Sequence, residues 1–417
     1  MAEDDAGTGA ARKRRHPGLS GIAHLLRIAT EGPAGQGGER HATWLELFFD
    51  LVFALLLTSV AARLGDPAEP SLNRLASTFA IFLLAEWIWY TQAFYDNRFD
   101  PDDTPHRILV LTAAAGVGVL GLGAHDVPDG LLFPLGYLAV RAMLLLMYLR
   151  VLASRPGSRQ VAGVYLTGFG FGWLCWLGSL AVDPAVRPVL WITGLVGEFA
   201  ALWLGRRWLA RSPVHAGHLP ERIGQLLIIL LGAMLTTVLG RVPLPDPPVR
   251  ALLAAAAAFV VSVCFWWTYT SFLAAGLPIR RRLGSGQVYG LIHVPAGIAV
   301  LFLGWTSGQV VAQITQDAGR LPGILRAVLA GSLVIWMLTG VVLQWFLLGA
   351  VPRARAVATA LGVVLVAGVA AGSVVPAVTL ALTTAIMIGY SITVNAQLAR
   401  SGTGNTGHPT SAQPETP

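Results

Sequence analysis

The sequence predicts an all-α, polytopic membrane protein with about twelve transmembrane helices. Hydrophobic residues make up 54% of its 417 residues and charged residues only 12%, about half the charged share of a soluble domain. The mean hydropathy is +0.63. A single soluble core does not keep growing at this length without more polar surface to cover it. The composition therefore argues against a soluble enzyme, a disordered chain and a fibrous protein.

The chain divides into a polar arm, a long apolar region and a polar tail. Residues 1–40 are basic and Gly-rich and lack the apolar stretch of a signal peptide, so we expect a disordered cytoplasmic arm. Residues 398–417 are rich in Gly, Thr, Ser and Pro and predict a disordered tail. The transmembrane domain is predicted between them, over 41–397.

Twelve apolar segments in this domain are long enough to cross a bilayer. They are 43–64, 73–95, 106–124, 130–153, 160–182, 187–208, 219–240, 249–273, 286–308, 322–348, 353–373 and 375–397. The last two are separated by a very short connection, so a re-entrant pair is an alternative there.

The arginine and lysine distribution predicts the orientation. With the N-terminus inside, twenty-one basic residues lie on the cytoplasmic side and seven on the outer side, as the positive-inside rule requires. Both termini are then cytoplasmic, in a bacterial plasma membrane. The arginines are spread between apolar segments, so a nucleic-acid partner is not expected. The two cysteines lie in apolar runs and predict no disulfide or metal site.

A weak internal repeat suggests two six-helix halves, 43–208 and 219–397, in parallel order. The first segment carries Glu46 and Asp50, and the seventh carries Glu221 and Gln225 at the same spacing. About forty residues later each half has an aromatic cluster, Trp87-x-x-Tyr90-Thr91 and Trp266-x-x-Tyr269-Thr270. Chance clustering of aromatic residues at a membrane interface is the alternative.

Polar residues at membrane depth are the first candidate site. Charges there are costly and normally face a bundle interior or a water-filled cavity. The candidates are Glu46, Asp50, Glu86, Tyr90, Tyr137, Arg141, Glu198 and His293. Four of them are carboxylates facing one arginine, so some should hold a proton or bind a cation. Alternatively, these side chains only join helix to helix by hydrogen bonds.

An acidic stretch after the second segment is the other candidate site. It contains Asp96, Asn97, Arg98, Asp100, Asp102, Asp103 and Arg107. Its oxygen atoms could hold Mg²⁺, and its arginines could bind a diphosphate headgroup. The residue pattern Asp100-x-Asp102-Asp103 also matches the acid motif of proton-initiated terpene cyclases. Alternatively, the stretch is a turn in which Asp102 or Asp103 caps the third segment and Arg98 is ion-paired.

Several of these motifs resemble the bacterial low temperature requirement protein A family over residues 43–350. The matching strings are Trp44-Leu-Glu46-Leu-Phe-Phe-Asp50-Leu-Val-Phe53, the stretch from Trp89 to Arg107, Tyr137-x-x-x-Arg141, His218-Leu-x-Glu221-Arg222, Trp266-Trp267-x-Tyr269, and Tyr289 with His293. The resemblance implies an integral membrane protein named for a low-temperature growth phenotype, and no particular reaction.

The chain departs from this family at two acidic positions. Gly232-Ala233-Met234 stands where the family usually has Gly-Glu-Ser, and Thr270-Ser271 stands where it often has Phe-Asp. The polar residues of the first half are therefore the better candidates for a site.

Three functions are consistent with these features. The leading hypothesis is a polar cavity, including Glu221 and Arg222, that binds or transports a small polar solute with proton or cation coupling. The second is a membrane-embedded enzyme acting on an isoprenoid or lipid diphosphate through Asp100, Asp102 and Asp103. The third is a non-catalytic stress-response scaffold. Carboxylates near the bilayer midplane favour transport, and carboxylates beside a lipid-facing groove at one surface favour the enzyme.

Overall fold

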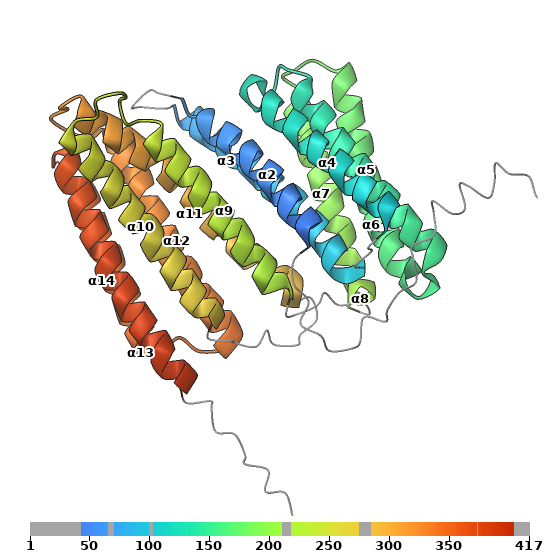
Figure 1. The fold of residues 1–417 in the computed structure, drawn as a ribbon. Coiled ribbons are helices and arrows are strands. Elements are labelled where there is room, and N and C mark those ends of the chain that lie inside the picture. Colours follow the sequence, from blue (N-terminus) through green and yellow to red (C-terminus); the bar gives the residue numbers. More distant parts are fainter. Residues whose placement is uncertain are drawn as a thin grey trace, which may run out of the picture.

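A computed structural model describes residues 43–65, 71–99, 103–210, 218–274, 285–372 and 374–403. Within these ranges the chain forms thirteen α-helices, joined by short turns and three 3-10 turns. Twelve of the helices are long and lie side by side as one layered bundle (Figure 1). They are α2 (Trp44–Ala62), α3 (Leu72–Phe99), α4 (Thr104–Gly123), α5 (Leu132–Ser154), α6 (Arg159–Gly178), α7 (Arg187–Leu204), α9 (His218–Leu239), α10 (Val249–Ala274), α11 (Ser285–Thr315), α12 (Gly323–Leu348), α13 (Arg353–Ala371) and α14 (Pro376–Thr403).

The predicted all-α membrane fold is confirmed. Each of the twelve predicted segments forms one of the long helices, and α8 (Arg206–Leu209) is a single additional turn. In the described ranges, eleven helices are long and apolar enough to cross a membrane. Many of their large apolar side chains, such as Leu55, Trp203 and Val364, point outward, where lipid tails would cover them.

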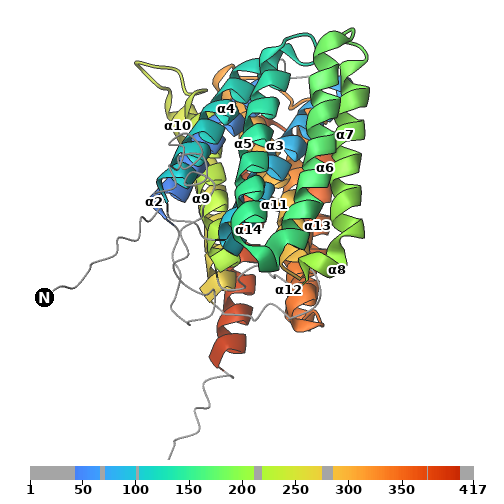
Figure 2. The ribbon, with the colours of Figure 1, turned by 90° about the vertical axis from the view of Figure 1, so that its right-hand side faces the viewer.

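The twelfth long helix, α3, lacks that apolar composition because it is enclosed by protein. Every side chain from residue 84 to residue 99 is buried. Together with α2 it lies between a group formed by α4–α7 and a group formed by α9–α14 (Figure 1). Figure 2 views the bundle from the α4–α7 side and shows α3 behind α5 and α6. A helix that faces other helices, and not lipid, can carry polar residues if they find partners.

Several helix neighbours recur in both halves of the chain, although α10 packs extensively along α14 and the corresponding helices of the first half, α3 and α7, have no comparable contact. The first helix of each half packs along the third, α2 on α4 and α9 on α11. The third then packs along the fourth, and the fifth along the sixth. The two halves meet mainly through α2 and α9. The duplication of a six-helix unit stays a prediction. Of its boundaries, 43 directly precedes α2, whereas 208 lies in α8, 219 in the first turn of α9, and 397 in the last turns of α14.

The last two predicted segments form two full helices, so the structure does not contain the re-entrant pair considered as an alternative. α13 has 19 residues and α14 has 28, and about 20 residues span the hydrocarbon core. α14 also continues past the expected boundary at 397 to Thr403. The predicted arm, 1–40, and the remainder of the predicted tail, 404–417, lie outside the described residues.

Small residues allow α6 to approach α7 closely. A side chain at Gly168 would lie 2.6 Å from Ala201 Cβ, and one at Gly172 would lie 2.5 Å from Glu198 Oε1. Gly170, on the opposite side of α6, faces open space. Two of the three glycines thus serve helix packing, and Gly172 leaves room for a buried carboxylate.

Candidate functional site

Three of the predicted residues, Tyr137, Arg141 and Glu198, form one buried cluster between α5 and α7. Arg141 and Glu198 are an ion pair, and side chains of α5 and α3 add hydrogen bonds to it. Arg141 NH2 lies 2.8 Å from Glu198 Oε2, and both side chains are completely buried. Tyr137 OH donates to Glu198 Oε1 at 2.6 Å, and Trp87 Nε1 donates to Glu198 Oε2 at 2.6 Å. Arg141 also donates to the hydroxyls of Tyr137 and Thr91, at 3.0 and 2.6 Å. Of the four candidate carboxylates, Arg141 thus pairs with Glu198.

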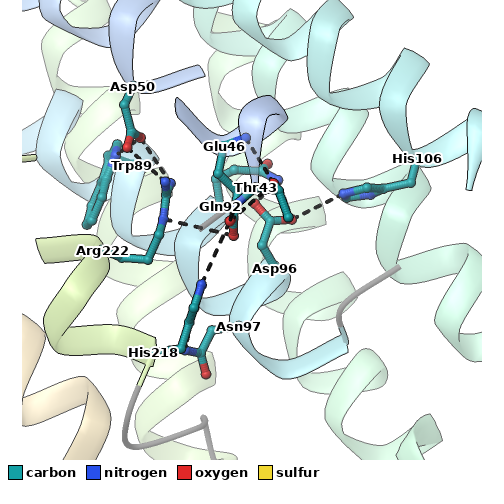
Figure 3. A network of polar contacts seen from close by, with 10 residues as sticks. All are labelled: Thr43, Glu46, Asp50, Trp89, Gln92, Asp96, Asn97, His106, His218 and Arg222. Atoms are coloured by element: carbon teal, nitrogen blue, oxygen red, sulfur yellow. Dashed lines mark hydrogen bonds and ion pairs between the residues drawn. The ribbon is translucent and has the colours of Figure 1, made fainter. Parts of the chain in front are cut away.

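A second ion pair joins α2 to α9. Arg222 donates to both oxygens of Asp50, at 2.8 and 2.9 Å, and Trp89 Nε1 donates to Asp50 Oδ1 at 2.8 Å (Figure 3). Arg222 is only 1% exposed. The count of four carboxylates facing one arginine did not include Arg222, which lies in α9 and pairs with Asp50. Glu46 closes a capping box with Thr43 and lies 3.9 Å from Arg222 Nε.

The first part of the predicted acidic loop is helical and buried. α3 continues to Phe99, so Asp96, Asn97 and Arg98 belong to its last turns and not to a surface loop. Asp96 accepts two hydrogen bonds from Gln92, at 3.0 Å each, and lies 3.5 Å from His106 Nε2. Figure 3 shows these side chains converging beside Glu46 at the start of α2.

Two further contacts complete this end of α3. Asn97 Nδ2 lies 3.3 Å from His218 Nδ1. Arg98 donates to Tyr165 OH at 3.0 Å, and its guanidinium lies over the Tyr165 ring. Polar residues at the end of α3 thus connect it to α4, α6 and α9.

The second part of the acidic stretch has a structural role at Asp103. This residue is the N-cap of α4, where its carboxylate accepts from His106 N at 2.7 Å and from Arg150 NH2 at 2.7 Å. Partial burial acts to raise the pKa of Asp103, but the bonds to Arg150 and His106 outweigh it, so this pKa lies below its usual value of 3.8.

The rest of the predicted magnesium site is less defined. Asp100 and Asp102 lie outside the described residues, and Arg107 is exposed on α4. Within the described ranges no three His, Cys, Asp or Glu side chains group as metal ligands. Magnesium binding therefore stays a prediction.

Glu86 differs from the other buried carboxylates because no base pairs with it among the described residues. It is 1% exposed, and its Oε1 has no hydrogen-bond partner. It faces a cavity of about 10 Å³ between α3, α9 and α11, enough for about one water molecule. Tyr90 and His293 line the same cavity, with apolar side chains of α9 as the opposite wall.

His293 stands between this cavity and a second one. Its Nδ1 donates to the carbonyl of Tyr289 at 2.7 Å, whereas Nε2 has no partner. In the neutral ring this bond assigns the proton to Nδ1, so Nε2 is a free acceptor. The second cavity, of about 30 Å³, lies between α10, α11, α12 and α13. His293 lines both cavities.

The second cavity contains a charged residue that the sequence did not reveal. Arg355 was not among the candidate residues; it lies in the first turn of α13 and is only 5% exposed. Its Nε has no partner. The signal available in the sequence was its place two residues after the start of an apolar segment, where an arginine can be either a surface anchor or a buried group.

The predicted residues therefore do not line one cavity. Tyr137, Arg141 and Glu198 form one cluster, Glu46, Asp50 and Arg222 form another, and Glu86, Tyr90 and His293 line a third site. All three surround α3. Glu221 is half-buried at the start of α9. The cluster of Arg141 and Glu198 is charge-balanced, and Glu46 and Asp50 share Arg222. Glu86 and Arg355 differ because neither has an oppositely charged partner among the described residues.

Comparisons with known proteins place these features in a family. Residues 41–392 match the family model described as bacterial low temperature requirement A protein (LtrA). An uncharacterized protein of Rhizobium meliloti (strain 1021), RA0937, is 27% identical over 265 residues. That similarity covers 56% of this chain and 63% of the relative, so the chain spans less than two thirds of the relative's length.

Proposed function

We propose that this chain, which belongs to the bacterial low temperature requirement A protein family, binds a small polar solute and moves it across the membrane together with a proton carried by Glu86. The observation that supports this proposal is the unpaired Glu86 carboxylate beside the free Nε2 of His293 in one cavity. We place the protein in the bacterial plasma membrane with both termini in the cytoplasm, from the arginine distribution.

The position of Glu86 supports transport. It lies fourteen residues after the start of the 28-residue α3, close to the middle of the helix. An ionised carboxylate there needs a neutralising partner, and a mobile proton or a bound cation can supply it. By contrast, Asp50 and Glu198 have arginine partners at 2.8 Å, so they suit a structural role.

The helix opposite Glu86 has features that allow movement. α11 carries Pro295 inside its length, and a proline removes one backbone hydrogen bond and weakens the helix locally. Gly297 lies against Glu86, where a Cβ would approach Oε1 to 3.0 Å. Interrupted helices at the midplane are typical places for substrate and ion binding in transporters.

Proteoliposomes containing a trapped pH dye test the proposal. Zwitterionic amino acids, neutral sugars and short monocarboxylates are added outside in turn, with protein-free vesicles as the baseline. We expect one class to change the internal pH through the wild-type protein but not through Glu86→Gln. Asp317→Asn removes a carboxylate that is 86% exposed and should behave like the wild type. A response that survives in Glu86→Gln, or no response to any class, would contradict the proposal.

A further inference from the structure

We propose that the second cavity binds a short-chain monocarboxylate, with Arg355 and Tyr269 holding the carboxylate group. This inference names the solute class of the function proposed above and rests on it. The cavity of about 30 Å³ is lined by both polar and apolar side chains, and the space for about two or three water molecules suits a ligand of only a few heavy atoms. The lining includes Tyr269, Phe272, His293, Trp336, Thr339 and Arg355.

The charge of the cavity favours an anion. Arg355 is buried, and in the part of the chain that the structure describes no carboxylate pairs with it. Its guanidinium lies over the ring of Tyr390, 5.3 Å from the ring centroid. A buried guanidinium without a counter-ion is costly. It also lies in the first turn of α13, which contains no acidic residue and where the helix dipole adds positive potential. A bound anion would offset both.

The fold provides room for this guanidinium. A Cβ at Gly340 of α12 would collide with Arg355 NH2. Glycine at this position therefore lets the arginine lie inside the bundle, between α12 and α13, where it lines the cavity. A surface arginine would need no such space.

The free hydrogen-bonding groups match a carboxylate. Tyr269 OH is buried and makes no hydrogen bond of good geometry, although the Tyr289 hydroxyl lies near it, so with Arg355 it offers a donor to a ligand. Thr339 already donates to the carbonyl of Ile335 at 2.8 Å, which leaves its oxygen as an acceptor. His293 Nε2 is an acceptor in the neutral ring and a donor when protonated. His293 Nε2 can therefore donate to a bound carboxylate only when the ring is protonated, whereas Arg355 and Tyr269 provide donors in either state of His293.

Apolar side chains fill the rest of the wall and limit the ligand to a small apolar tail. Trp336 is fixed by stacking on Phe265, with ring centroids 4.0 Å apart, and Phe272 lies beside it in the lining. A sugar or a dicarboxylate would leave polar groups unpaired against these rings. The site therefore selects one charged group with a short hydrocarbon chain.

Isothermal titration calorimetry of the full-length protein in detergent tests this site. The probes are sodium propionate, its neutral analogue propionamide, and sodium chloride. We expect propionate to bind and the other two not to bind, because propionamide lacks the charge and chloride lacks the tail. Arg355→Gln should weaken propionate binding by about tenfold or more, since a hydrogen bond to a charged group contributes that much. Arg353→Gln, two residues away and exposed, is the matched control.

Wild-type data alone can decide the question if Arg355→Gln does not fold. Equal binding of propionate and propionamide, equal binding of chloride, or no binding of propionate would each overturn the inference. So would an unchanged affinity in a folded Arg355→Gln protein. Binding in detergent does not require flux, so propionate binding without any pH response in vesicles would contradict transport alone. A Glu86-dependent response to another solute, without propionate binding, would contradict this inference alone.

Discussion

Replacing Arg141 by leucine should destabilise the protein more than any change at an exposed arginine. The substitution keeps an apolar stem but removes the guanidinium that lies 2.8 Å from Glu198 Oε2, in a place where both side chains are fully buried. Tyr137 and Trp87 would still donate to Glu198, but neither carries a positive charge. The carboxylate is then an uncompensated charge inside the bundle.

The expected loss is large compared with that of a surface pair. Breaking a buried ion pair by removing one partner costs about 3–5 kcal/mol. Arg250 lies 3.6 Å from Asp317, but their side chains are 48% and 86% exposed, so Arg250→Leu should cost about 1 kcal/mol or less. Adding Glu198→Gln to Arg141→Leu removes the stranded charge and should recover about 2–3 kcal/mol relative to additive losses.

Reversible unfolding by SDS in mixed micelles measures these free energies of unfolding. The four proteins of the cycle, wild type, each single variant and the double variant, are compared with Arg250→Leu under one set of conditions. If Arg141→Leu is no less stable than Arg250→Leu, the ion pair of Arg141 and Glu198 does not contribute more to the free energy of unfolding than the exposed pair of Arg250 and Asp317. If the losses at Arg141 and Glu198 simply add, the two groups are not coupled and the reasoning fails.

Three further predictions concern packing, pH and topology. Gly172→Ala should lower the melting temperature in detergent, because the added Cβ would lie 2.5 Å from Glu198 Oε1. Gly170→Ala should leave it unchanged, because no atom lies within 4 Å of the added Cβ. Equal melting temperatures of the two variants would contradict this packing. Asp103 should contribute its full stabilisation of the folded state above pH 3.8, its usual pKa, and lose it as the pH falls through its lower pKa in the folded protein. Asp103→Asn keeps the cap, so unfolding curves of this variant should lack that part of the acid-dependent loss of stability. Reporter fusions at 126 and 243 should be external and those at 102 and 214 cytoplasmic; an external signal at 102 would reverse the orientation.

Helix number and position could be predicted from sequence because lipid contact imposes a strong pattern. Eleven of the twelve long helices in the described ranges are apolar over a spanning length, and apolar runs of that length are easily recognised. α3 was also predicted, although its polar residues extend through its last turns to Phe99. Its end was placed too early, at 95, because Asp96, Asn97 and Arg98 are typical of a loop. Burial among other helices, which sequence alone does not show, allows them in a helix.

The sequence predicted which polar residues are buried better than it predicted which of them pair with one another. A buried arginine such as Arg141 requires a carboxylate partner, but the sequence does not say which of the candidate carboxylates it is. The structure shows that the partner is Glu198 and not Glu86. Arg222 was missed as the partner of Asp50 because it lies near the start of a helix, where arginines usually face water. Arg355 was missed for the same reason. A helix end can be covered by neighbouring helices, and this depends on packing between segments that are distant in the sequence, such as those of Asp50 and Arg222, 172 residues apart.

The unpaired charges are more informative than the paired ones. Asp50 and Glu198 each have an arginine at 2.8 Å and a tryptophan donor, which explains why they are tolerated in the bundle without any ligand. Glu86 and Arg355 have opposite charges, yet they face separate cavities and no contact joins them in the described structure. If both were only structural, pairing them would remove the cost of both. Their separation, with His293 lining both cavities, is instead what a site for a proton and an anion requires.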